Sequence, residues 1–304
     1  MEYRQFGKTG AVVSRIGFGG AAAGLKNYLG KYDPEDEESR NSVYAALELA
    51  LERGITYYDT APGYGGGTSE RIFGDVLSKV DPEKIFLATK CFPSDDGSLG
   101  ERPHTRTLSD YDFVMYSVEG SLKRLRRDYV DLLQLHGNSY TKDMKDRIVG
   151  AKGALEALER LKKEGIIKYI GFTTEDNNDA VYDLIRTRRF DAIQLCYNFI
   201  FQHPYEPSRP FGSLLEAEKK KMGIATMRTT TSGTFQKWMR MIRPHDTFDY
   251  TRALIQFVLS NELVDVALIG MRTPHEVLQN VDIVNDTSGR IDLDSLHERY
   301  VGEN

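Results

Sequence analysis

The stretch YVDLLQLH, residues 129–136, is largely apolar and ends on a histidine. A parallel strand that is covered on both faces is apolar along its length, whereas a half-exposed strand alternates apolar and polar residues. The stretch is therefore typical of a buried parallel strand. Seven further short apolar runs have the same character and lie at residues 13–18, 55–59, 85–90, 166–172, 191–196, 224–228 and 264–270.

Segments with helical periodicity separate these runs. Val43, Ala46, Leu47 and Ala50 follow the spacing of an amphipathic helix, and Gly54 can end that helix in a left-handed conformation. Further helical patterns lie at residues 114–125, 155–161 and 250–258. The sequence therefore alternates strands and helices along most of its length.

Eight such units favour a closed (β/α)8 TIM barrel. A doubly wound open sheet would also alternate, but eight units of this length suit the barrel better. We expect an N-terminal β-hairpin that turns near residues 8–10 to precede the barrel, and a C-terminal helical segment to follow it. No linker divides the sequence, so we expect one domain over residues 1–304.

The composition excludes several classes of protein. The net charge of -5 argues against nucleic acid or an anionic membrane as the main partner. No apolar run approaches the ~18 residues of a membrane span, and residues 1–5 lack the apolar core of a signal peptide. Cys91 and Cys196 cannot form a disulfide framework, and the six histidines show no metal-binding spacing. We therefore expect a cytoplasmic protein without a metal; its oligomeric state is left open.

Four polar residues follow consecutive apolar runs at the points where these runs end. Asp59, Lys90 and His136 end three of the runs, and Tyr64 lies in the loop after the first. The carboxyl ends of barrel strands converge on one mouth, so we expect the four side chains to meet. Each residue alone has an ordinary explanation as a cap, a solvated charge or a packing residue. Their occurrence together favours a functional site.

The chemistry of this group suits a carbonyl that accepts hydride. A buried Lys90 ammonium beside Tyr64 is expected to lower the pKa of the phenol from its usual ~10. Asp59 would keep Lys90 charged, and His136 could hydrogen-bond the substrate oxygen. The four residues would then combine a proton donor with a site that stabilises an oxyanion.

Four blocks of sequence resemble the aldo-keto reductase family. GITYYDTAPGYG at residues 54–65 looks like the family signature, and TSE at residues 68–70 leads into a helix as the family does. LATK at residues 87–90 and DYVDLLQLH at residues 128–136 match the family's lysine and histidine strands. The resemblance runs from about residue 3 to about residue 280. It implies hydride transfer from a nicotinamide to a carbonyl carbon and a catalytic tetrad of Asp59, Tyr64, Lys90 and His136.

The resemblance also implies where the cofactor binds. Gly17-Phe-Gly-Gly20 lacks the full GxGxxG pattern and indicates a turn rather than a phosphate loop. The resemblance instead places the cofactor across the later strand ends. Met227 stands where many members carry an aromatic residue that stacks on the nicotinamide. The implied cofactor-binding residues are Thr173, Thr174, Gln194, Met227, Arg228, Gly270, Arg272, Gln279 and Asn280.

The cofactor preference depends on the last of these segments. Many NADP(H)-dependent members carry a basic residue at the position of Glu276, whose carboxylate would repel a 2′-phosphate. Arg272 could bind that phosphate instead, together with the amides at the start of the last helix. This arrangement favours NADP(H) and leaves NAD(H) possible.

Several functions are compatible with this sequence. The leading one is an NAD(P)(H)-dependent oxidoreductase that acts on a small carbonyl or alcohol, namely an aldehyde, ketone or sugar. ATKC at residues 88–91 and IGM at residues 269–271 resemble the branch with aldose and L-galactose dehydrogenases, so an NAD-linked aldose dehydrogenase is an alternative. Another is a cofactor-sensing regulatory subunit without significant turnover. A Schiff-base aldolase is disfavoured, because Asp59 would hold Lys90 protonated.

The substrate is not readable from the sequence. We expect specificity to be set by the loops at residues 93–110 and 199–210, by the segment near Tyr28, and by the chain after Asn285.

Overall fold

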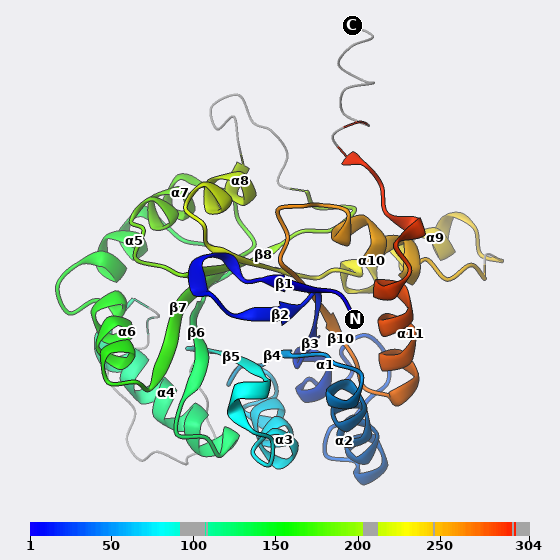
Figure 1. Ribbon diagram of the computed structural model, residues 1–304, viewed down its shortest axis with the longest axis horizontal. Helices are drawn as coiled ribbons and strands as arrows, with labels where there is room; N and C mark the ends of the chain where they lie inside the picture. Colours follow the sequence, from blue (N-terminus) through cyan, green and yellow to red (C-terminus); the bar gives the residue numbers. More distant parts are fainter. Residues whose placement is uncertain (92–106, 108, 203–211, 246, 294, 296–304) are drawn as a thin grey trace, which may run out of the picture.

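The computed structural model describes residues 1–91, 107, 109–202, 212–245, 247–293 and 295. Within these residues eight parallel strands form a closed barrel, in which the last strand pairs with both its predecessor and the first strand. The barrel strands are β3 (Ile16–Gly19), β4 (Tyr57–Asp59), β5 (Phe86–Cys91), β6 (Val130–His136), β7 (Ile167–Thr174), β8 (Ala192–Cys196), β9 (Gly223–Met227) and β10 (Val266–Gly270). The predicted TIM barrel is confirmed (Figure 1).

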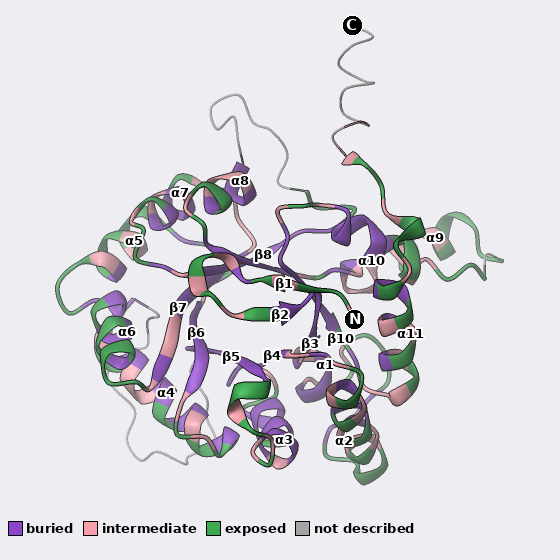
Figure 2. Cartoon of the chain, in the orientation of Figure 1, coloured by how far each residue is buried: buried purple, intermediate pink, exposed green. Residues whose placement is uncertain are grey.

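Helices surround the barrel (Figure 1). Most of these helices bury the face toward the barrel and expose the other, as the amphipathic patterns predict, whereas the helix at residues 234–242 has no buried residue (Figure 2). They are α1 (Ala21–Gly24), α2 (Glu37–Glu52), α3 (Thr68–Leu77), α4 (Tyr111–Leu125), α5 (Lys142–Val149), α6 (Ala154–Lys163), α7 (Asp179–Arg186), α8 (Gly212–Lys219), α9 (Thr234–Ile242), α10 (Thr251–Leu259) and α11 (Pro274–Asn285). In the part of the chain that the structure describes, no helix is both long and apolar enough to cross a membrane.

For the first apolar run, the structure differs from the single strand that the sequence predicts. The run at residues 13–18 divides into the hairpin strand β2 (Val12–Ser14) and the barrel strand β3. Between them Arg15 is buried, and its guanidinium donates to the carbonyls of Val264 and Leu259. A continuous strand could not both pair with β1 (Tyr3–Gln5) and enter the barrel, so the chain changes direction at Arg15.

The hairpin closes one end of the barrel. β1 and β2 pair antiparallel and cross the barrel end in Figure 1, which confirms the predicted hairpin. Phe6 follows β1 and is fully buried, with its ring centroid 5.5 Å from Tyr57 and 5.3 Å from Phe86. These aromatic rings fill the barrel interior at its amino-terminal end. The open end is therefore the one where the strands finish.

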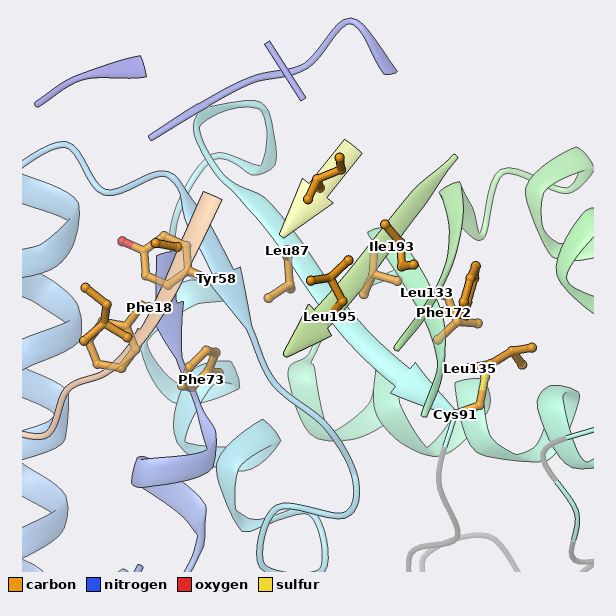
Figure 3. Packing of buried hydrophobic residues seen from close by; sticks show 14 of the residues in the cluster. Phe18, Tyr58, Phe73, Leu87, Cys91, Leu133, Leu135, Phe172, Ile193 and Leu195 are labelled. Atoms are coloured by element: carbon orange, nitrogen blue, oxygen red, sulfur yellow. The ribbon is translucent and has the colours of Figure 1, made fainter. Parts of the chain in front are cut away.

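A second apolar layer joins the barrel to its helices. Phe18 on β3 lies 6.2 Å from Tyr58 and 5.7 Å from Phe73 of α3, between ring centroids (Figure 3). Leu133 and Phe172 belong to the same buried cluster on the opposite side of the barrel. Packing between the strands and the surrounding helices holds the strands in place, and it therefore also holds the polar side chains at the strand ends.

One buried ion pair ties two helices to the strand that carries Lys90. Glu70 of α3 accepts from Nε of Arg124 of α4 at 2.7 Å and from the hydroxyl of Thr89 of β5 at 2.6 Å. Both charged side chains are buried. Gly67 makes room for the pair, because a Cβ there would lie 2.5 Å from Cδ of Arg124.

Most of the loops expected to set specificity, at residues 93–110 and 199–210, lies outside the described residues. The same holds for the chain beyond residue 295.

Replacing Arg124 by Met should lower the free energy of unfolding by about 3–5 kcal/mol, since it leaves the buried Glu70 carboxylate without its cation. Urea denaturation followed by circular dichroism would measure this. The matched control is Lys123→Met, which removes an exposed pair with Glu119 on the same helix and should cost less than ~0.5 kcal/mol. Equal losses in the two variants would contradict a structural role for the buried pair.

Candidate active site

The barrel brings the four predicted catalytic residues to one end. Asp59 ends β4, Lys90 lies near the end of β5, and His136 ends β6. Lys90 Nζ lies 2.6 Å and 2.7 Å from the two carboxylate oxygens of Asp59. The same nitrogen is 4.9 Å from the ring centroid of Tyr64, whose ring meets that of His136 edge-on at 5.6 Å. Residues separated by 77 positions in sequence thus share one cluster.

The loop after β4 positions Tyr64 through a tight return of the chain. Gly65 has φ +73°, and a Cβ there would lie 2.1 Å from the carbonyl oxygen of Gly24. Only glycine fits both the left-handed conformation and this close approach. Ser69 holds the base of the loop, because its amide donates to the carbonyl of Tyr64 and its hydroxyl to that of Gly20. The phenol of Tyr64 is therefore held by backbone geometry.

Lys90 is fully engaged by the end of β4. Besides Asp59, its ammonium donates to the carbonyl of Thr60 at 2.9 Å. Burial raises the pKa of Asp59 and lowers the pKa of Lys90, while the opposite charge of each partner opposes the other's shift. Hydrogen bonds from three directions favour the charged pair.

One expectation about Tyr64 is wrong. The structure raises the pKa of Tyr64 well above its usual value instead of lowering it. Burial is the main cause, with the charge of Asp59 adding to it. Lys90 lies over the ring face and its charge is balanced by Asp59, so it does not stabilise the phenolate. Tyr64 is accordingly a protonated phenol at neutral pH.

His136 is neutral at neutral pH. Burial lowers the pKa of His136 to about 3, and the nearby charge of Lys90 acts in the same direction. A neutral imidazole can donate one hydrogen bond through its N–H group and accept one through the other nitrogen. Beside a protonated Tyr64, it can orient an oxygen atom without carrying charge.

A cavity of about 250 Å³ opens at this cluster. Asp59, Tyr64 and His136 line one part of it. Five of the residues implied to bind the cofactor line it as well, namely Thr173, Gln194, Met227, Arg228 and Gly270. The strand register explains part of this set, since His136 pairs with Thr173 and Thr173 with Gln194 across β6, β7 and β8.

The side chain of Gln194 is held from inside the barrel. Its Oε1 accepts from Nε2 of Gln134 at 3.1 Å, across the intervening strand β7. Gly171 of β7 makes this possible, because a Cβ there would lie 3.0 Å from Cγ of Gln134. Gln194 also stabilises the Asp59 carboxylate and so helps to limit the rise in its pKa.

The remaining four implied cofactor residues do not line this cavity. Thr174 is buried, and its hydroxyl donates to the carbonyl of Asp176 at 3.0 Å. Gln279 is bound to the carboxylate of Asp249 at 2.9 Å, and Asn280 is buried in the same helix, α11. Arg272 precedes α11 and donates to the carbonyls of Tyr28 and Leu29.

Three amides at the start of α11, those of Arg272, Thr273 and Glu276, already have acceptors, which leaves fewer of them for a phosphate than the sequence suggests. The carboxylate of Glu276 accepts from the amides of Arg272 at 2.7 Å and Thr273 at 3.0 Å, in a capping box. These amides already have an acceptor. The guanidinium of Arg272 lies 4.7 Å from the ring centroid of Tyr32. Among the implied cofactor-binding residues, Arg272 is the cation that directly precedes the N-cap of this helix.

Two contacts across the cavity were not predicted from the sequence. Tyr28 and Ser232 both line the cavity, and their hydroxyl groups lie 3.1 Å apart. Glu175 also lines it and forms an ion pair with Arg228, 2.7 Å between Nη2 and Oε1. The only local signal for Glu175 is that it directly follows Thr173 and Thr174 at the end of β7.

Comparison with known proteins gives one consistent family. A family model described as the aldo/keto reductase family matches residues 15–254. The chain is 28% identical to the L-galactose dehydrogenase of Arabidopsis thaliana, over 98% of this chain and 93% of that protein. It is 27% identical to the D-threo-aldose 1-dehydrogenase of a Pseudomonas species, over 90% of each.

A solved structure shares the fold. It is an aldo/keto reductase from Klebsiella pneumoniae in complex with NADP and acetate, with a TM-score of 0.67 and 21% identity, covering 98% of this chain and 94% of that chain. Since the family model spans most of the barrel, this chain belongs to the aldo/keto reductase family and is an NAD(P)-dependent oxidoreductase.

Proposed function

We propose that this protein interconverts a small carbonyl compound and its alcohol with NADP(H), and that Tyr64 moves the proton. The observation that carries the proposal is a protonated phenol held in one cavity with a neutral imidazole and a buried Asp59–Lys90 pair. A carbonyl that accepts hydride needs a proton donor at its oxygen. In the direction of oxidation, the same phenol oxygen takes the proton back.

The residues along the cavity fit a nicotinamide cofactor. Away from Tyr64, the lining offers the hydroxyls of Thr230 and Ser232, which suit an anionic diphosphate, whereas the hydroxyl of Thr229 already donates to the carbonyl of Leu268. The two carboxylates that line the cavity are Asp59 and Glu175, and each is paired with a cation. When bound, the nicotinamide supplies or accepts the hydride.

The chain's own residues then divide the remaining work. Thr173, Gln194 and Met227 lie together on neighbouring strands and would hold the nicotinamide, while His136 would orient the substrate oxygen toward the Tyr64 hydroxyl. The buried pair of Lys90 and Asp59 lies beneath the site, and its two charges cancel, so the net charge of the site stays near zero. Neutral surroundings keep Tyr64 protonated until the substrate oxygen needs the proton.

NADP(H) is the proposed cofactor on two grounds. The Klebsiella relative was solved with NADP, and Arg272 places a cation beside α11. The Glu276 carboxylate at the same helix start keeps NAD(H) possible. Gln279 and Asn280 remain proposed adenine contacts.

An NAD-linked aldose dehydrogenase is the second candidate. Two relatives that align with nearly the whole chain are named for sugar oxidation. An aldolase reaction through Lys90 is disfavoured, because all three N–H directions of its ammonium are engaged by Asp59 and Thr60. A cofactor sensor without turnover would use the same cavity and is distinguished by the first experiment below. The cytoplasmic location and the single domain over residues 1–304 stay predictions.

Replacing Tyr64 by Phe should lower kcat by ~10²-fold or more while cofactor affinity holds, because the transferable proton is lost and the ring remains. Turnover of an aldehyde panel with NADPH, and cofactor titration by fluorescence, would measure both. Tyr129→Phe is the control, since it removes a half-buried phenol near the opposite end of the barrel. A Tyr64→Phe variant with near-normal turnover would refute the proposed proton donor, and a wild type that binds NADPH without any turnover would favour the sensor.

The pH profile should differ between the two directions. Reduction needs protonated Tyr64, whose pKa is raised, so its rate should stay flat from about pH 6 to about pH 9. Oxidation needs the phenolate, so its rate should rise about tenfold per pH unit over the same range. His136, with its pKa near 3, should add no limb near pH 6. A limb at about pH 6.5 that disappears in His136→Asn would show that the imidazole titrates there.

Replacing Arg272 by Gln should weaken NADPH binding by about 10-fold or more and leave NADH binding within about 3-fold, because a charged contact to phosphate is worth about 1.5–3 kcal/mol. Fluorescence titration with both cofactors would measure this. Arg53→Gln, an exposed cation at the end of α2, is the control. Equal losses for the two cofactors would mean that Arg272 acts only by holding Tyr28 and Leu29.

A further inference from the structure

The Glu175–Arg228 ion pair spans the cavity mouth over a third strand. Glu175 follows β7 and Arg228 follows β9, while β8 lies between these strands in the barrel. The side chains meet at 2.7 Å above the end of β8 and are 33% and 42% exposed. The pair is therefore reachable by a ligand, although both backbones are fixed in the barrel wall.

The fold holds each partner in place. The amide of Glu175 donates to the carbonyl of Asn138 in the loop after β6, at 2.7 Å. Arg228 has φ +59°, a left-handed conformation that is unfavourable for a non-glycine residue, and its carbonyl accepts from the amide of Thr231. The Arg228 side chain that leaves this backbone position is paired with Glu175.

The pair forms the wall between two cavities. Glu175 and Arg228 line the cavity that holds Tyr64 and also a second cavity of about 200 Å³. Ile200 and Phe201 give the second cavity an apolar side. Its buried amide, Asn198, is already used, because its Oδ1 accepts from the amides of both residues at 2.9 Å. Among the described residues, the ion pair supplies the charged groups of this cavity, and the hydroxyls of Thr231 and Thr234 are further polar side-chain groups.

A paired guanidinium and carboxylate recognise a particular chemistry. Arg228 retains N–H donors beyond the one bound to Glu175, and the carboxylate retains free acceptor sites. A hydroxyl group both donates and accepts, so two neighbouring hydroxyls can bind the pair without breaking it. An anionic group would be repelled by the carboxylate of Glu175. An alkyl group would remove water from both charges without replacing the lost hydrogen bonds.

We propose that the Glu175–Arg228 pair is the specificity-determining contact of this enzyme and binds neighbouring hydroxyls of a polyhydroxylated substrate whose reacting carbon lies at Tyr64. The second cavity receives the far end of that substrate. This inference rests on the proposed function. Both charges act on the reacting group, since Arg228 lowers and Glu175 raises the pKa of Tyr64. The pair and the phenol line the same cavity of about 250 Å³, so one molecule bound there can contact both.

The test compares three substrates in wild type, Glu175→Gln, Arg228→Gln and the double variant. They are an aldose (L-galactose), an aldehyde without hydroxyls (4-nitrobenzaldehyde) and an anionic aldehyde (succinic semialdehyde). Each single variant should raise KM for the aldose by about 10-fold with kcat within about 3-fold. The double variant should lose no more than the worse single one, because the pair acts as a unit. In Glu175→Gln, the aldehyde without hydroxyls should change by less than about 3-fold. Arg228 is also among the implied cofactor residues, so the NADPH affinity of Arg228→Gln is measured separately.

The anionic aldehyde gives a readout that a merely structural role would not produce. Glu175→Gln frees the charge of Arg228, so KM for succinic semialdehyde should fall, and Arg228→Gln should not lower it. Equal losses on all three substrates, or weaker NADPH binding by fluorescence titration in Arg228→Gln, would overturn the inference. A wild type that reduces 4-nitrobenzaldehyde but turns over no aldose in either direction would overturn it and leave the proposed function standing. A wild type that turns over none of the substrates would overturn both.

Discussion

The buried ion pair of Asp59 and Lys90 is the constraint on which the site depends. Two charges removed from water are costly, so the surrounding chain must satisfy every hydrogen-bonding direction. It does so with neighbouring strand ends, because Asp59 closes β4, Lys90 lies on β5, and the carbonyl of Thr60 takes the third ammonium hydrogen. The register between β4 and β5 therefore sets the relative positions of Asp59 and Lys90. Glu70 and Arg124 support the same strand from outside through Thr89.

Burial around that pair decides the protonation state of Tyr64 and His136. A lone ammonium beside Tyr64 would favour the phenolate, but the carboxylate cancels it and burial then dominates. For His136 burial is again the main cause, and here the charge of Lys90 acts in the same direction. The resting site thus contains one ion pair, one neutral acid and one neutral imidazole, which is the arrangement that a neutral carbonyl compound meets on entry.

Local patterns in the sequence predict the barrel and the cluster well. The apolar runs predict the strands. Asp59, Lys90 and His136 lie in separate segments of the sequence, and their proximity follows from the rule that the ends of parallel barrel strands converge. The direction of the pKa of Tyr64 could not be predicted, because it depends on where Lys90 points and on how deeply the phenol is buried. The division of residues 13–18 into two strands depends on Arg15 reaching carbonyls about 250 residues away in sequence. The contacts of Tyr28 with Ser232, and of Glu175 with Arg228, likewise join residues far apart, and no spacing rule marks them.

The aromatic plug at the hairpin end has a consequence for the traffic of molecules. With Phe6, Tyr57 and Phe86 filling the amino-terminal end, the barrel is a blind tube. Within the described residues, the cavity lies at the carboxyl ends of the strands, where the ion pair after β7 and β9 and the Tyr28–Ser232 contact line it. Whichever molecule lies deeper must arrive first and depart last. The aromatic residues that close the amino-terminal end therefore constrain the order in which cofactor and substrate bind and leave, although they take no part in the reaction.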